Sequence, residues 1–175
     1  SIKIKNPQNC PACGTKLVKI SNQSIYKCTN EYNCKPQIVQ AIQHFASRKA
    51  MNISGLGESI IESLVDLKII NNFTDLYGLT VKRLKDVDRL GEKSSQNLID
   101  SINNSKKIPF DKLIYALGIK EVGISTAQSL AANYKDLSLL MSDSKDELCL
   151  INDIGDVVAE NIYNYFKNPI NKKLI

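Results

Sequence analysis

Apolar residues return at fixed places around four glycines, Gly57, Gly91, Gly123 and Gly155. Counted from each glycine, an aliphatic residue stands at positions −4, −1 and +7, and a small residue stands at +4 in three of the four copies. The glycines are 34, 32 and 32 residues apart, so one repeating unit fills most of the chain beyond residue 50. This spacing predicts a helix, a tight turn and a second helix in each copy, with the aliphatic residues facing inward.

The segments between the units predict how they are connected. The polar stretch 103–109 divides the units into two pairs, 50–104 and 110–167. Short helices are expected at 75–79, 110–117 and 137–141, and Ser144 with Glu147 forms a capping box that opens a further helix. We therefore expect a mainly α fold in which a connecting helix at 36–49 leads into the paired units at 50–167.

Each turn ends at a glycine that opens the second helix of its unit. We expect the turn to need a positive φ at this glycine, which glycine adopts at no steric cost. The first N–H groups of the second helix have no partner within it and lie at its positive end. That arrangement suits a phosphate, so the pattern is typical of helix-hairpin-helix motifs that bind the sugar-phosphate backbone of DNA without reading bases. The alternative is a helical repeat array whose glycines serve only as caps.

The charges at the four turns differ. Arg89 and Lys93 flank the second turn, which we expect to be the strongest phosphate clamp. Asp153 and Asp156 flank the fourth turn and would repel a phosphate, so this hairpin is structural or its acids point away. The candidate DNA contacts are Gly55, Leu56, Gly57, Arg89, Gly91, Lys93, Val122, Gly123, Ile154, Gly155, His44 and Arg48.

Four cysteines near the start of the chain have the spacing of a metal site. Cys10 and Cys13 form a knuckle with Gly14, and Cys28 and Cys34 follow, with apolar runs at 17–20 and 25–27 around the polar turn 21–24. A β-hairpin between the two pairs would bring four thiolates around one tetrahedral Zn²⁺, with no open position for catalysis. Residues 10–35 are thus expected to form a small zinc finger with four cysteine ligands, in which the zinc is structural. Four unrelated thiols or two disulfides are the alternative.

Two further residues are candidates for chemistry. Cys149 stands among aliphatic residues and is expected to be a small buried side chain. His44 is the single histidine, and we favour a structural or phosphate-contacting role for it over a fifth zinc ligand or a general acid–base.

Charge is unevenly distributed along the chain. The net charge is +5, yet residues 1–49 contain eight lysines and arginines against one acid, whereas residues 50–175 contain fifteen against seventeen. The basic end therefore provides bulk attraction for a polyanion, and the repeats must bind through placed groups. No apolar run approaches the length of a membrane span, and no secretory signal is recognisable.

In combination, these motifs resemble those of the bacterial NAD-dependent DNA ligases. The resemblance rests on the four cysteines with a five-residue gap between Cys28 and Cys34, on the segment 42–57, and on Gly91–Leu98, Ala116–Gly123 and Asp153–Gly155. It covers nearly the whole chain. It implies a C-terminal fragment of a nick-sealing enzyme of replication and repair, in which this part grips the minor groove of duplex DNA.

The resemblance also implies what lies outside this chain. Residues 1–9 would be the tail of an upstream oligonucleotide-binding domain, and 168–175 would be a linker toward a C-terminal domain. NAD and Mg²⁺ would be bound by catalytic domains that contact this part within one polypeptide. The Lys-x-Asp-Gly motif of the adenylated lysine occurs nowhere in the sequence, so this fragment alone is expected to be inactive. We further expect a monomer in the bacterial cytoplasm, associated with the nucleoid, that binds nicked double-stranded DNA.

Two other classes of function remain open at this stage. A different repair module would also contain helix-hairpin-helix motifs, although the wide cysteine gap disfavours it. A zinc-stabilised protein-interaction module would not bind nucleic acid at all.

Overall fold

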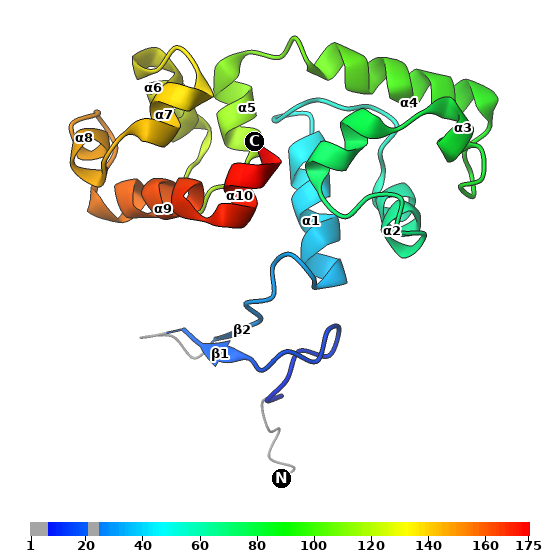
Figure 1. The fold of residues 1–175 in the computed structure, drawn as a ribbon, viewed down its shortest axis with the longest axis horizontal. Coiled ribbons are helices and arrows are strands. Elements are labelled where there is room, and N and C mark those ends of the chain that lie inside the picture. Colours follow the sequence, from blue (N-terminus) through cyan, green and yellow to red (C-terminus); the bar gives the residue numbers. More distant parts are fainter. Residues whose placement is uncertain (1–6, 21–24) are drawn as a thin grey trace.

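The computed structural model describes residues 7–20 and 25–175 and shows a mainly helical chain (Figure 1). A small segment with two strands lies at one end of the molecule, and helix α1 (Lys35–Ala46) connects it to the helical part. In Figure 1, α1 lies between two groups of helices, one formed by the middle of the chain and one by its C-terminal third. The predicted fold class is confirmed.

The two strands are shorter than the pattern predicted. Strands β1 (Val18–Lys19) and β2 (Tyr26–Lys27) pair antiparallel, with Val18 opposite Lys27 and Lys19 opposite Tyr26. All four residues of these strands are exposed, so the strands do not pack on a hydrophobic core that would favour a longer sheet. The turn predicted at 21–24 lies outside the described residues, as does the predicted tail up to residue 6.

The helices follow the same order twice. In the first pair, α1 packs on α2 (Glu58–Asp66), the 3₁₀ helix η1 (Phe73–Gly78) connects, and α3 (Val81–Leu84) packs on α4 (Glu92–Ser105). In the second pair, α5 (Phe110–Ala116) packs on α6 (Ile124–Asn133), α7 (Leu137–Ser142) connects, and α8 (Lys145–Cys149) packs on α9 (Asp156–Lys167). Each packed pair of helices is one predicted hairpin.

Each pair of hairpins has its own hydrophobic core, and Ala116 of α5 is buried in the first of them. The residues at −1, +4 and +7 of all four units are buried, as predicted, and the one difference at −4 is Ile151, which is half-buried. Ser95 occupies the +4 position of the second unit and is fully buried, as are the residues at +4 in the other units.

Helix α1 is more than a connector. Its residues Val39, Ile42, Phe45 and Ala46 are buried in the first core, so α1 is the first helix of the first hairpin. The sequence placed the start of the hairpin units at residue 50. In the structure residues 47–51 form a turn, and the first helix of the first hairpin, α1, lies before it.

The C-terminal residues also differ from the expectation. Residues 168–175 were expected as a linker, whereas Pro169–Leu174 form helix α10, packed against α9. Asn168 caps this helix through Ile170 N–H, and Pro169 occupies its first turn, where proline is tolerated. Asn171 is buried at 5% exposure, which fixes the helix against the rest of the molecule.

Candidate metal centre and nucleic-acid interface

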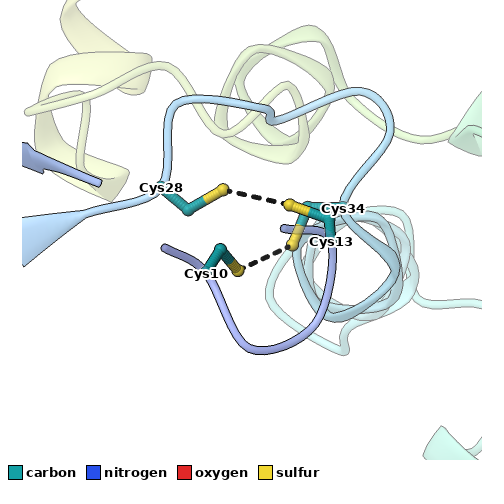
Figure 2. A group of neighbouring side chains, drawn as sticks. All are labelled: Cys10, Cys13, Cys28 and Cys34. Carbon is teal, nitrogen blue, oxygen red and sulfur yellow. Dashed lines mark hydrogen bonds between the residues drawn. The ribbon is translucent and has the colours of Figure 1, made fainter. Parts of the chain in front are cut away.

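The four cysteines of the predicted finger lie together, and their side chains point toward one another (Figure 2). Their sulfur atoms all lie within 4.8 Å of one another, with Cys10 and Cys34 3.9 Å apart and Cys13 and Cys28 3.5 Å apart. Four sulfurs bound at about 2.3 Å to a tetrahedral Zn²⁺ stand about 3.8 Å apart. A disulfide would need about 2.05 Å, so the alternative of two disulfides is excluded.

Short turns place these sulfurs. Gly14 has a φ of 74°, which lets the knuckle close through hydrogen bonds from Gly14 N–H to Cys10 C=O and from Cys10 N–H to Thr15 C=O. On the other side, the N–H of Cys34 donates to Asn30 C=O across the gap between the last two cysteines. Cys10 and Cys34 are buried, and Cys13 and Cys28 are half-buried.

The protonation of the cluster favours a bound cation. Hydrogen bonds from the Thr15 hydroxyl and backbone N–H lower the pKa of the Cys13 thiol to about 6. The pKa of Cys28 is raised to about 11, because the Asn30 N–H, which lowers it, is outweighed by desolvation and by the neighbouring thiols Cys13 and Cys10. Thiolates held this close together repel one another, and a bound dication removes that repulsion. The residues fit a structural zinc ion, and Thr15 is a supporting residue that the sequence analysis missed.

The hairpin turns correct one prediction about glycine. Positive φ occurs two residues before each repeat glycine, at Gly55 (85°), Arg89 (67°), Glu121 (63°) and Asp153 (67°). The repeat glycines themselves are extended, with φ between −76° and −85°. The turn therefore needs its left-handed residue at −2, where only the first hairpin has glycine.

The repeat glycines are instead bare N-caps. Helices α2, α4, α6 and α9 begin at Gly57, Gly91, Gly123 and Gly155 without a side-chain cap. By contrast, η1, α3, α7, α8 and α10 are capped by side chains of Asn72, Thr80, Asp136, Ser144 and Asn168. A Cβ added at Gly57, Gly123 or Gly155 would meet nothing within 4 Å, so packing inside the chain does not require glycine there.

The available donors lie after the turn. The side chains of Leu56, Val122 and Ile154 are buried. The N–H groups of Val122 and Ile154 already donate to Ile119 C=O and Ile151 C=O. What these turns can offer an anion is the N–H groups of the glycine and of the first helical residues behind it.

Exposed cations gather only at some of the turns. Arg89 and Lys93 are exposed on the second hairpin, and neither is in an ion pair among the described residues. Lys85, upstream of the same turn, is paired with Glu92 at 3.2 Å.

The fourth hairpin has a different surface. Asp153 and Asp156 are exposed, and Leu150 and Val157 beside them are 84% and 68% exposed. Cys149 is half-buried and not buried as expected, and its Sγ lies 3.4 Å from Asp156 Oδ1. Burial, followed by the Asp156 carboxylate, raises the pKa of this thiol.

His44 is placed between the two pairs. Its Nε2 lies 2.8 Å from Tyr115 C=O, and because a carbonyl only accepts, Nε2 carries the proton. The ring also lies against Gly118, whose Cβ position would be 3.5 Å from His44 Cδ2. These contacts favour the structural alternative for His44, whereas Arg48 is exposed just after α1.

Comparison with known proteins assigns the same regions. Residues 9–35 match the family described as the NAD-dependent DNA ligase C4 zinc finger domain. Residues 47–104 match a SAM-like helix-hairpin-helix tandem, and residues 112–175 match a helix-hairpin-helix motif. No helix among the described residues is long and apolar enough to cross a membrane.

Curated relatives align along almost the entire chain. Proteins named DNA ligase from Bacteroides fragilis and Legionella pneumophila are each 42% identical over 173 residues, which is 99% of this chain and 26% of theirs. A DNA ligase from Koribacter versatilis is 38% identical over 173 residues, again 99% of this chain and 26% of the relative. The chain thus spans about a quarter of the length of the curated relatives it matches. The resemblance to the bacterial NAD-dependent DNA ligases is confirmed.

Proposed function

We propose that this chain is the DNA-binding part of an NAD-dependent DNA ligase and that it grips nicked duplex DNA through the sugar-phosphate backbone. The observation that carries the proposal is the set of four hairpin helices that begin at uncapped glycines, while five of the seven other described helices have side-chain caps and the remaining two, α1 and α5, have a proline at their start. An uncapped helix start leaves backbone donors unsatisfied, and a phosphate satisfies them.

In this proposal the longer protein seals nicks during replication and repair. Catalytic domains outside this chain bind NAD and Mg²⁺, form an adenylated lysine and pass AMP to the 5′-phosphate at the nick. This sequence contains no Lys-x-Asp-Gly motif, so the part described here supplies grip and position but no adenylation centre. The finger, with its structural zinc, joins the catalytic domains to the hairpins.

The two alternatives differ in what they predict. The match of residues 9–35 to the ligase zinc finger favours a ligase over another repair module. A protein-interaction module would differ from both in that it would not bind DNA.

Binding of a fluorescent nicked duplex across a salt series tests the proposal. We expect log K to fall with log salt with a slope of roughly −4 to −8, since about five to nine phosphate contacts each contribute about −0.9. A slope near zero, or no binding at low salt, would favour the protein-interaction module.

A further inference from the structure

The five-residue gap between Cys28 and Cys34 holds one half-buried tyrosine, Tyr32. Residues 31–33 form a turn that Asn30 closes, because its C=O accepts from both Asn33 N–H and Cys34 N–H. A salt bridge of 3.0 Å between Lys27 and Glu31 spans the same loop. Tyr32 stands in this turn, two residues before the buried Cys34, so the metal cluster fixes the base of its loop.

The Tyr32 hydroxyl reaches the other end of the chain. It donates to Asn171 Oδ1 at 2.9 Å, although the two residues are 139 positions apart. The Asn171 Nδ2 group donates in turn to Tyr165 C=O at 3.0 Å, in the last turn of α9. Asn171 is a buried polar side chain, and both ends of its amide are satisfied by these two bonds.

The contact bridges two walls of a cavity. A cavity of about 800 Å³ lies between the finger, α1, the turn after α5 and helices α9 and α10, and Tyr32 and Asn171 both line it. Helix α9 is the second helix of the fourth hairpin, and it packs against α8 and α10. Tyr32 therefore connects the finger through α10 to the second pair of hairpins.

We propose that Tyr32 and Asn171 form a latch through which the zinc cluster positions the second pair of hairpins. Zinc binding orders the 28–34 loop, the loop presents the Tyr32 hydroxyl, and the hydroxyl holds α10 and the end of α9. The five residues between Cys28 and Cys34 form the loop that brings the Tyr32 hydroxyl to Asn171. The effect on DNA described below rests on the proposed function; the latch itself does not.

Hydrogen exchange tests the latch without DNA. The reporter is the N–H of Lys172, which donates to Asn168 C=O at 3.0 Å in α10. In Tyr32→Phe with zinc bound, we expect this N–H to exchange about three- to tenfold faster, the range for loss of one neutral hydrogen bond. Removing zinc from the wild type with a chelator should accelerate it at least as much, and in Tyr32→Phe it should add little. Amides of α4 should not change.

The matched control is Tyr26→Phe, because Tyr26 lies in the same finger and is 42% exposed. It should retain one zinc per chain and wild-type exchange in α10, and Tyr32→Phe should retain the same zinc. The latch is overturned if Lys172 exchanges equally in Tyr32→Phe and the wild type. It is equally overturned if zinc removal leaves α10 protected.

Nicked-duplex binding separates positioning from direct contact. Tyr32→Phe should weaken affinity by about two- to fivefold while the salt slope stays unchanged, because no phosphate contact is lost. A slope reduced by about one would make Tyr32 a DNA contact and contradict the latch. If the wild type binds no DNA, the proposed function fails, and the exchange data still decide the latch.

Discussion

At each hairpin turn, two different residues have special roles: the residue at −2 has a left-handed backbone, and the repeat glycine begins the second helix. The backbone demand is a left-handed φ two residues before the repeat glycine, and arginine, glutamate and aspartate meet it in three of the four turns. Such residues tolerate this conformation at a cost of about 1 kcal/mol. The repeat glycine is extended, and packing does not require it at Gly57, Gly123 or Gly155, so only a modest preference for glycine as an N-cap favours it within the chain. We propose that a ligand approaching the helix start is the further reason.

Replacing Gly123 by alanine tests this interpretation of the glycine. The added Cβ meets no atom within 4 Å, so the fold should persist, with a loss of at most about 1 kcal/mol from the poorer N-cap. The same methyl group would stand between a phosphate and the amides of α6, so affinity for nicked duplex should fall roughly tenfold, as for loss of a hydrogen bond to a charged group. Binding titrations and thermal melts measure the two effects.

Gly78→Ala is the matched control, because Gly78 is also exposed with open space at its Cβ position but ends η1 and opens no hairpin helix. It should leave DNA binding unchanged. Equal losses in the two variants would mean that the repeat glycines have no special access to the backbone of DNA.

At the scale of the element, local sequence patterns predicted the buried faces of the hairpin helices and one of the two capping boxes. The apolar positions around each glycine set the helix faces, and the capping box of Ser144 and Glu147 forms as expected. The capping box of Asn72 and Asp75 was missed, because the short helix was expected to begin at residue 75, after its cap. Helix α1 was assigned as a connector because its packing partners lie in later elements.

The second hairpin should be the strongest clamp, and the double change Arg89→Ala with Lys93→Ala tests it. Both side chains are exposed and lie outside any ion pair of the described residues, so unfolding free energy should change by less than about 0.5 kcal/mol per site. The salt slope of DNA binding should become shallower by roughly two, and affinity should fall by roughly tenfold or more at moderate salt.

The paired control is Lys172→Ala with Lys173→Ala, which removes the same charge from exposed positions of α10. Its slope should stay near that of the wild type. If both double variants lose the same amount, bulk charge and not the second hairpin would govern binding.

At the scale of the whole molecule, the arrangement depends on contacts that no local pattern contains. The buried residues form two clusters, whereas the break at 103–109 predicted two pairs of hairpins and not how their cores would divide. It could not predict that Tyr32 meets Asn171 or that His44 meets Tyr115, because these residues are 139 and 71 positions apart and each lies in a segment whose pattern is complete without the other. Hydrogen bonds of this kind join separate units, whereas periodicity predicts each unit by itself.

His44→Ala therefore tests how the pairs are held together. The change removes a hydrogen bond to Tyr115 C=O and a ring that packs against Tyr115, with centroids 4.8 Å apart, and Gly118. We expect unfolding free energy to fall by roughly 1 to 2 kcal/mol, because one part-buried hydrogen bond and the packing of the ring are lost, while Gly118 N–H still donates to Tyr115 C=O. The salt slope of DNA binding should not change, since no phosphate contact is lost. His44→Gln, which keeps a donor of similar reach, should recover part of the stability. Wild-type stability combined with weaker DNA binding in His44→Ala would instead place His44 on the DNA, and the contact between the pairs would then have to rest on other residues.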